Sequence, residues 1–324
     1  MKNKLNLLLT GASGFVGGAV LARLDQQSNC NVTMAVRTMP EQACDSKHVY
    51  HVHPLDEKAD WSPVVADVDV VVHCAARVHV MNDSVADPLA EFRRINVHGT
   101  MNLARQAAQA GVKRFIFISS VKVNGEGTSG SHFYSEDDIP APIDPYGISK
   151  LEAEKALNAL ATETGLEVVI IRPVLVYGPG VKANFRSMMS WLNKGIPLPL
   201  GSTANQRSLV AVDNLVDLII TCIDHPGAAN QTFLVSDGED LSTSELLRRM
   251  GLALGRPARL LPVPSWLLKL AALSIGKSSI SQRLCGSLQV DVSKAKRVLD
   301  WTPPVTVNEA LEKTALDFLE SVKK

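Results

Sequence analysis

A tyrosine and a lysine four residues apart form the pair in this 324-residue chain that is best suited to acid–base chemistry. Tyr146 and Lys150 follow Asp144 and Pro145, a capping residue and a first-turn residue that predict a helix running to about Thr164. On that helix both side chains share one face. A free phenol has a pKa of about 10 and a free lysine ammonium a pKa of about 10.4. Lys150 is therefore expected to stabilise the phenolate and to lower the pKa of Tyr146 toward the working range.

A serine pair supplies the hydroxyl that would orient the reacting oxygen. Ser119 and Ser120 close an apolar run that begins at Phe115 and predicts a buried strand. Parallel α/β sheets bind their ligands at the carboxyl ends of the strands. A tyrosine and a lysine at this spacing are common in proteins. Their position after a glycine turn and a strand-ending serine pair is what indicates a catalytic site.

Three glycines at residues 11, 14 and 17 predict a dinucleotide site rather than a plain strand–helix turn. A strand over Leu5–Thr10 precedes them and a helix over Val16–Gln26 follows. Their turn would therefore present backbone N–H groups and a helix N-terminus to a diphosphate. The expected cofactor ligands of this turn are Gly11, Ser13, Gly14, Phe15, Val16 and Gly17.

The end of the second expected strand, Asn31–Val36, indicates which dinucleotide is bound. An acidic residue there would bind the ribose 2′-hydroxyl of NAD, but this chain has Arg37 and no acidic residue before Glu41. A guanidinium matches a 2′-phosphate, so NADP(H) is favoured and NAD(H) is the alternative. The other interpretation of Arg37 is a solvated surface charge. Asp56 is expected to accept the adenine amino group.

Alternating strand-like and helix-like runs predict an α/β fold with a doubly wound parallel sheet of the Rossmann type. Val68–His73 and Val168–Ile171 are expected strands, and Ile95–Ala110 is an expected helix. Beyond residue 173 prolines and glycines concentrate, which predicts a smaller, woven C-terminal substrate domain over the strand ends. We expect a cofactor domain of residues 1–176 plus about 206–236, and a substrate domain of residues 177–205 and 237–324.

The charge balance and the cysteines limit the class of protein. With 33 Lys and Arg against 33 Asp and Glu, and no basic run, the chain is not expected to bind nucleic acid by neutralising phosphates or to bind a membrane through a polybasic surface. Five cysteines without paired spacing do not predict a disulfide framework, and they suit a reducing cytoplasm. The histidines at 48, 51 and 53 do not predict a metal site, because no carboxylate or cysteine completes a set of ligands.

Two apolar stretches could be mistaken for membrane signals. The N-terminal stretch resembles a signal peptide, but its regularly spaced glycines are better explained by the dinucleotide turn. In the stretch Leu252–Ile275 arginines and prolines interrupt the apolar residues, and no charge-free run approaches the ~18–20 residues of a membrane span. A helix after Ser265 is expected to be buried or to face another subunit, and contact with a membrane surface is the alternative.

The motifs together resemble the extended short-chain dehydrogenase/reductase family, in its nucleotide-sugar branch. They are the glycine turn, HCAA at 73–76, NVHGT at 96–100, SSVKVNG at 119–125, the Tyr/Lys pair and RPVLVYGPG at 172–180. The resemblance implies that Ser120 is the catalytic serine and that Lys150 also holds the nicotinamide ribose. Further cofactor contacts implied by these motifs are Ala75, Ala76, Asn96, Pro173 and Val176. Asn124, where the related epimerases have a tyrosine, is a departure from the pattern.

The same resemblance implies a UDP-sugar substrate and a set of residues that bind it. Asn184 matches an asparagine that holds the UDP, Arg207 matches an arginine on the diphosphate, and Arg283 is a second candidate for that role. Lys122 either contacts a phosphate of substrate or cofactor or pairs with Glu126 as a solvated loop residue. The family often forms homodimers through paired helices, which the helices containing Ile95–Ala110 and Leu151–Ala161 would provide.

Three activities compete within this resemblance. The favoured one is NADPH-dependent reduction of the C4 keto group of a UDP-4-keto-6-deoxy-N-acetylhexosamine, because residues 119–126, 181–185 and 236–240 look most like that subgroup. The alternative is a UDP-glucose or UDP-N-acetylglucosamine 4-epimerase with tightly bound NAD, against which Arg37 counts. A regulator that binds dinucleotide without turnover is the third, but such proteins usually lack the Tyr/Lys pair.

Overall fold

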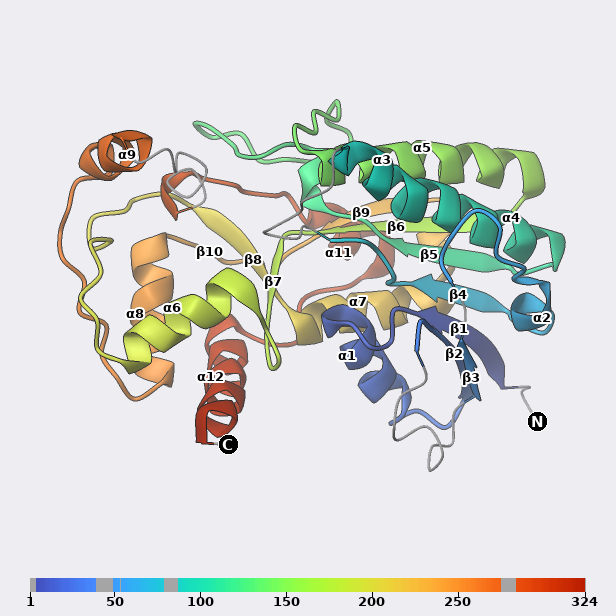
Figure 1. Ribbon diagram of the computed structural model, residues 1–324, viewed down its shortest axis with the longest axis horizontal. Helices are drawn as coiled ribbons and strands as arrows, with labels where there is room; N and C mark the ends of the chain where they lie inside the picture. Colours follow the sequence, from blue (N-terminus) through green and yellow to red (C-terminus); the bar gives the residue numbers. More distant parts are fainter. Residues whose placement is uncertain (1–3, 39–48, 53, 79–86, 275–283, 324) are drawn as a thin grey trace.

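A seven-stranded parallel sheet forms the centre of the molecule (Figure 1). The computed structural model describes residues 4–38, 49–52, 54–78, 87–274 and 284–323. The strand order is β3-β2-β1-β4-β5-β6-β9, so the chain leaves β1 in one direction and returns beyond it with β4. These strands are β1 Leu5–Thr10, β2 Cys30–Val36, β3 Val49–Val52, β4 Val70–His73, β5 Arg114–Ile118, β6 Glu167–Pro173 and β9 Thr232–Val235.

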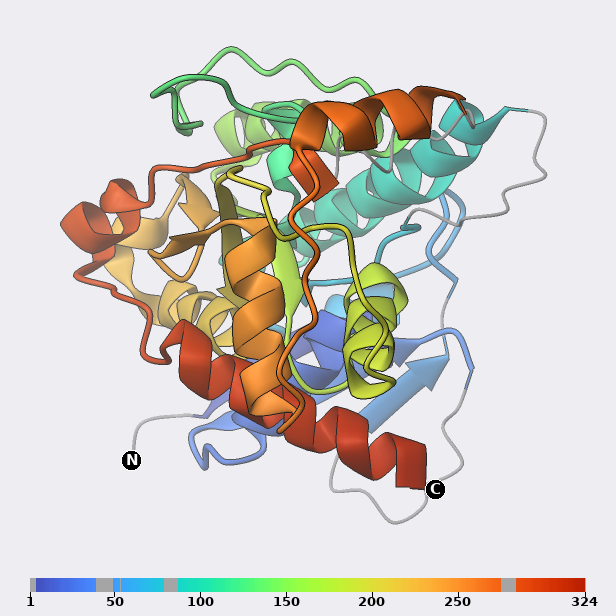
Figure 2. The same cartoon turned by 90° about the vertical axis from the view of Figure 1, so that its left-hand side faces the viewer.

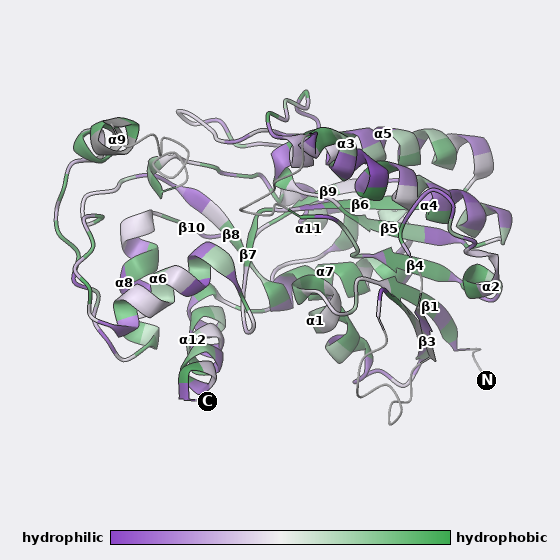
Figure 3. Cartoon of the chain, in the orientation of Figure 1, coloured by the Kyte–Doolittle hydropathy of each residue, from purple (hydrophilic) through white to green (hydrophobic). Residues whose placement is uncertain are grey.

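The central strands are mostly apolar because helices cover both faces of the sheet. Successive residues of one strand enter different cores: Leu7 and Leu9 pack on one side and Leu8 on the other. Ile116 and Phe117 of β5 divide in the same way. Figure 3 shows these strands as a hydrophobic layer between more mixed helices. The expected doubly wound parallel sheet is confirmed.

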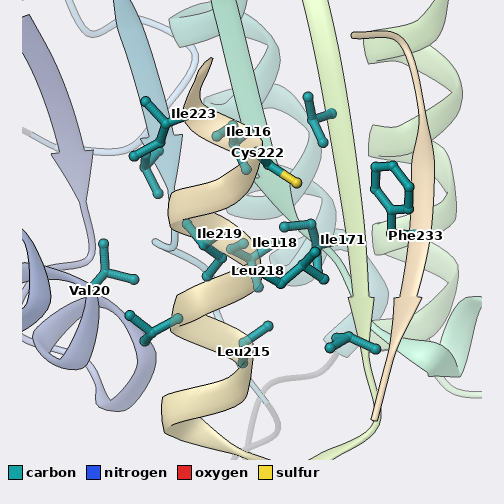
Figure 4. Close-up of a cluster of buried hydrophobic side chains, with 14 of the residues drawn as sticks. Val20, Ile116, Ile118, Ile171, Leu215, Leu218, Ile219, Cys222, Ile223 and Phe233 are labelled. Carbon is teal, nitrogen blue, oxygen red and sulfur yellow. The ribbon is translucent and has the colours of Figure 1, made fainter. Parts of the chain in front are cut away.

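Two sets of helices cover the faces of the sheet (Figure 1). One face carries α1 (Phe15–Leu24) and α7 (Val212–Asp224), and Figure 4 shows α7 wedged between Val20 and the strand residues Ile118 and Ile171. The other face carries α4 and α5. The helices on that side are α2 Ser62–Val65, α3 Pro88–Arg93, a π-helical turn Arg94–Gly99, α4 Thr100–Gln109 and α5 Pro145–Thr164.

A second, three-stranded sheet with its own core lies beside the first (Figures 1 and 2). Its strands, in the order β10-β8-β7, are β10 Asp240–Leu241, β8 Arg207–Ala211 and β7 Leu175–Tyr177. Residues 207–211, expected with the cofactor domain, therefore pair in the smaller sheet, whereas α7 and β9 join the large one. The remaining helices are α6 Ala183–Asn193, α8 Thr243–Ala253, α9 Ser265–Ser274, α11 Ser293–Leu299 and α12 Val307–Lys323. Short 3₁₀ turns cover Val121–Val123 and Pro226–Ala228.

Two helices differ from the sequence-based expectation. The helix expected from Ile95 begins at Pro88, capped by Asp87, and continues into α4 through the π-helical turn. The helix expected after Ser265 is present as α9, but four of its side chains are not buried within the chain, and its contact with another subunit or with a membrane surface stays a prediction. Trp266, Leu267, Leu270 and Leu273 of α9 are all exposed. In the described part of the chain no helix is both long and apolar enough to cross a membrane.

Candidate active site

The glycine turn between β1 and α1 brings two backbone segments closer together than side chains would allow. Gly11 has a φ of +73°, and a Cβ on it would lie 2.6 Å from the nitrogen of Ala75 after β4. A Cβ on Gly17 would lie 2.1 Å from the carbonyl oxygen of Gly11. Among the described residues, no side chain caps the N-terminus of α1 at Gly14. The first N–H groups of α1 are thus open to an anion, and an oxygen-rich diphosphate matches them.

Asn96 joins the segment after β4 to the helix that carries the tyrosine. Its side chain lies in the π-helical turn, accepts from the N–H of Arg77 at 2.8 Å and donates to the carbonyl of Arg77 at 3.0 Å. Its amide also donates to Ser149 Oγ at 3.1 Å. Asn96 is buried, so these bonds fix the wall formed by Ala75 and Ala76. π-Helical turns are frequent at functional sites, where they re-aim a side chain.

A buried histidine that the sequence interpretation did not use supports this wall. His73 Nδ1 lies 2.8 Å from Thr10 Oγ1, which accepts from the N–H of Ala75 at 3.2 Å. His73 Nε2 lies 3.0 Å from Thr100 Oγ1. Burial, and then the charge of Lys150, lower the pKa of His73 to about 3. The imidazole is therefore neutral and acts as a hydrogen-bonded spacer between β1, β4 and α4.

The other predicted cofactor residues lie beyond β2 and β3, at the end of β6 and in β7. Arg37 is exposed just beyond the end of β2. Asp56 is half-buried after β3, and its Oδ1 accepts from the N–H of Lys58 at 2.9 Å. Pro173 closes β6, and Val176 lies in β7, where the chain passes to the smaller sheet. Their contacts with a cofactor stay predictions.

Tyr146 and Lys150 lie in the first two turns of α5, whose N-terminus is capped as expected by Asp144 accepting from the N–H of Gly147 at 2.6 Å. Lys150 is buried, donates to the carbonyl of Ile118 at 2.7 Å and lies 5.9 Å from the centre of the Tyr146 ring. Burial lowers the pKa of Lys150 to about 8, against a raising effect of Glu154.

The expected lowering of the Tyr146 pKa is wrong for this structure. Burial, and then the carboxylate of Asp144, raise the pKa of Tyr146. The ammonium of Lys150 bonds to a carbonyl below the ring and does not approach the phenol closely enough to offset this effect. Burial and Asp144 therefore favour the protonated phenol, which can donate a proton to a carbonyl oxygen. For Tyr146 to accept a proton instead, nearby positive charge has to stabilise its phenolate.

Ser120 follows β5 and caps the 3₁₀ turn Val121–Val123, accepting from the N–H of Lys122 at 3.2 Å. This bond uses an oxygen lone pair, so the hydroxyl proton of Ser120 can be donated to a ligand. Lys122 pairs with Glu126 at 3.0 Å and also with Asp144. The expected pairing with Glu126 is present, and a contact of Lys122 with a phosphate stays a prediction.

Two cavities of about 400 Å³ each lie against the glycine turn and against the loop that follows Ser120. One lies against the glycine turn, where Lys182 faces Ser13, Gly14 and Phe15. Lys182 was not singled out from the sequence, because a single exposed lysine has no pattern. The other cavity lies between the loop that follows Ser120 and residues 286–287, which directly precede Leu288. Its lining residues are Gly125, Glu126, Gly127, Thr128, Ser129, Tyr134, Ala141, Ile143, Gly286 and Ser287.

The predicted substrate residues are spread over the smaller sheet and its helices. Arg207 opens β8 and donates to the carbonyl of Gly286 at 3.1 Å, which places it beside the second cavity. Asn184 is exposed in the first turn of α6, after Ala183 with a φ of +54°. Arg283 lies outside the described residues.

Most of the chain matches a known family model. Residues 7–236 match the NAD dependent epimerase/dehydratase family. The chain belongs to this family. Its nicotinamide dinucleotide cofactor, Rossmann fold and extended short-chain dehydrogenase/reductase architecture, expected from the motifs, are thereby established.

Several epimerases are similar to this chain in sequence or in fold. A UDP-glucose 4-epimerase of Vibrio cholerae is 53% identical over 317 residues, which cover 98% of this chain and 96% of that protein. The N-acetyl-alpha-D-glucosaminyl-diphospho-ditrans,octacis-undecaprenol 4-epimerase of Escherichia coli O157:H7 is 27% identical, with 95% and 94% covered. The structure of a UDP-N-acetylglucosamine 4-epimerase from Bacillus cereus has a TM-score of 0.80 at 21% identity, with 98% and 100% covered, and shares the fold.

The expected reduction of a UDP-4-keto-6-deoxy-N-acetylhexosamine is wrong. The 53% identical relative is an epimerase, and it covers almost the whole of both chains. The error has a chemical cause, because a reductase and an epimerase move the same hydride and the same proton at C4. The two enzymes differ in whether the keto sugar enters from solution or is formed and consumed within the site. Short motifs around Ser120 do not encode that difference.

Proposed function

We propose that this protein is a UDP-hexose 4-epimerase, which inverts the C4 hydroxyl of UDP-glucose or UDP-N-acetylglucosamine around a retained NAD. The similarity to the Vibrio cholerae UDP-glucose 4-epimerase carries the proposal. The presence of Ser120, Tyr146 and Lys150 at the carboxyl ends of the strands supports it, because a non-catalytic dinucleotide regulator has no need of all three.

In this mechanism the chain's own residues hold the sugar and move one proton. Ser120 donates a hydrogen bond to the oxygen at C4, and Tyr146 takes the proton of that oxygen and later returns it. Tyr146 must accept the first proton as a phenolate, and it is a neutral phenol between the two transfers. Lys150, positively charged below pH about 8, stabilises the phenolate before the first transfer and after the second. When bound, the nicotinamide supplies the acceptor and donor of the C4 hydride and, while oxidised, a positive charge.

The cofactor site proposed here takes NAD rather than NADP. An epimerase regenerates its cofactor in every cycle and needs no exchange with a pool of reduced NADP. The open N-terminus of α1 and the close packing of Gly11 on Ala75 suit the diphosphate of either dinucleotide. The proposed ligands are the glycine-turn residues, Asp56, Ala75, Ala76, Asn96, Tyr146, Lys150, Pro173 and Val176.

The substrate side of the proposal uses the smaller sheet. Arg207, next to the cavity of about 400 Å³ between Gly125 and Ser287, would hold the diphosphate, and Asn184 would contact the UDP. The division into a cofactor domain and a nucleotide-sugar domain is part of the same proposal. So are a homodimer through α4 and α5 and a cytoplasmic location, the latter supported by five cysteines without paired spacing.

The proposed activity predicts that hydrogen returns to the carbon it left. Purified protein should contain NAD and convert UDP-[4-²H]glucose to its C4 epimer with the deuterium retained, as measured by NMR. UDP-N-acetylglucosamine labelled in the same position tests the second substrate. Failure to interconvert either sugar in the presence of NAD, or exchange of the label with solvent, would contradict the proposal.

The proposal also predicts that Arg37 has little effect. Because NAD has no 2′-phosphate and Arg37 is exposed, Arg37→Ala should change NAD affinity and kcat by less than about threefold, the scale of a screened surface charge. Isothermal titration with NAD and NADP measures both affinities. If wild-type protein prefers NADP and the variant loses that preference by tenfold or more, the cofactor is NADP.

A further inference from the structure

A buried cluster of charged and polar side chains lies one helical turn below Lys150. Glu154 follows Tyr146 and Lys150 at the same four-residue spacing on α5 and is 2% exposed. Its carboxylate accepts from Arg172 of β6, with a shortest distance of 2.6 Å from Nη2. Arg172 Nε lies 3.0 and 3.2 Å from the two carboxylate oxygens, so the pair is bidentate.

The cluster reaches both ends of the turn that contains Ser120. Ser119, next to Ser120 in the chain, donates to Glu154 Oε1. Arg172 Nη1 donates at 3.1 Å to Asn124, the residue that departs from the tyrosine of related epimerases. The amide of Asn124 donates in turn to the carbonyl of Ser135 at 2.8 Å. Glu154 and Arg172 together thus tie α5 and β6 to both ends of the turn that contains Ser120.

Residues from several elements surround the ammonium of Lys150. Neutral His73 and the thiol of Cys74 face it from the end of β4, and Phe117 of β5 lies 4.4 Å below it. Tyr146 and Glu154 face it from its own helix. The one carboxylate among these groups is Glu154, and its charge raises the pKa of Lys150 against the effect of burial. Arg172 balances Glu154 from the side of β6.

We propose that Glu154, held by Arg172 and Ser119, is a positioning residue that keeps Lys150 charged and fixes Ser120 at the catalytic site. The proposal rests on the proposed function for the roles of Lys150 and Ser120. A buried ion pair of this kind often adds little to stability, because desolvation offsets the attraction between its charges. The ion pair lies along the face of α5 that carries Tyr146 and Lys150. We therefore assign it the role of orienting the turn that contains Ser120 against α5.

The variant Glu154→Gln tests the proposal by removing the charge and keeping the size of the side chain. Losing a nearby negative charge and leaving Arg172 unbalanced both disfavour the ammonium, so the pKa of Lys150 should fall by about one unit or more below 8. The alkaline limb of the kcat–pH profile should move down with it. We expect kcat at pH 7.5 to fall about tenfold or more while KM changes less than about threefold. Glu154→Asp should restore part of the loss.

Glu152→Gln is the matched control on the same helix, because Glu152 forms a partly exposed pair with Arg93 of α3. It should leave the pH profile unchanged. ¹³C NMR of protein labelled at lysine Cε reads the titration of Lys150 directly, with its signal assigned by its loss in Lys150→Met. This measurement needs no sugar, so failure of the epimerase proposal and failure of the positioning proposal give different results.

Ser119→Ala covers the case in which Glu154→Gln does not fold, since it removes one hydrogen bond and leaves the ion pair intact. It should lower kcat several-fold without changing the affinity for NAD. A folded Glu154→Gln protein whose Lys150 titrates as in wild type would overturn the proposal. An unfolded Glu154→Gln protein together with a fully active Ser119→Ala would overturn it as well.

Discussion

Replacing Tyr146 with phenylalanine should lower kcat by about 10²-fold or more and leave NAD binding within about twofold. The phenol hydroxyl moves the proton of the C4 oxygen in the proposed mechanism. Phenylalanine lacks this hydroxyl and retains the rest of the side chain. The Tyr146 ring packs edge-on against Phe92 with the ring centres 6.0 Å apart, and that contact needs no hydroxyl. Steady-state kinetics with UDP-glucose and titration of the protein with NAD separate the two effects.

Tyr177→Phe is the control for loss of a phenol hydroxyl elsewhere. Tyr177 is buried in the smaller sheet, where its hydroxyl donates to Asp237 at 2.8 Å. That variant should lose a little stability and keep its kcat. If Tyr146→Phe retained wild-type turnover, Tyr146 would not be the proton carrier. A parallel loss of NAD binding would point to a collapsed site instead of a missing proton.

Replacing Gly17 with alanine should lower the NAD content of the purified protein about tenfold or more. It should also lower the free energy of unfolding by about 1–3 kcal/mol, the usual cost of overpacking. The added Cβ would lie 2.1 Å from the oxygen and 2.7 Å from the carbon of the Gly11 carbonyl. Both atoms belong to the backbone, so relief requires the glycine turn itself to move away from α1. The N–H groups expected to bind the diphosphate move with it. NAD content after purification and thermal unfolding check the two parts.

Gly18→Ala is the matched control one residue further along α1. There the Cβ would lie 3.3 Å from the carbonyl oxygen of Ala12, a contact that a shift of a few tenths of an ångström relieves. Alanine is also the better helix former by about 1 kcal/mol. The control should therefore bind NAD and stay at least as stable as wild type. Normal NAD content in Gly17→Ala would show that the turn tolerates the shift.

Local patterns in the sequence predicted the parts of the site that lie close together along the chain. The glycines of residues 11–17, the serine pair after β5 and the cap of α5 are each encoded within a few residues. Their geometry follows from turns and helix periodicity, which act over the same distance. The parallel sheet was predictable for the same reason, because its strands are short, mostly apolar runs that alternate with helix-like segments.

Contacts between distant segments were not predictable in this way. Glu154, Arg172 and Asn124 meet only because α5 packs across the ends of β5 and β6. The raised pKa of Tyr146 depends on burial and on where Asp144 lies, and neither can be read from a four-residue spacing. The exposure of Trp266 and its neighbours on α9 likewise depends on what packs against that helix.

The sequence by itself indicated a dinucleotide-binding α/β fold with a Ser, Tyr and Lys set suited to hydride and proton transfer. Its resemblance to the nucleotide-sugar branch of the family implied that a sugar carbon is the reacting atom. The sequence did not determine whether the enzyme is a reductase or an epimerase. The short motifs favoured a reductase, whereas similarity over the whole chain supports an epimerase. Only the tertiary structure decided which charges act on the catalytic groups. In the folded protein Lys122 pairs with the carboxylates of Glu126 and Asp144, and the charge of Glu154 acts on Lys150. The physical reason is that electrostatic effects depend on distance and burial in space, whereas a motif records distance along the chain.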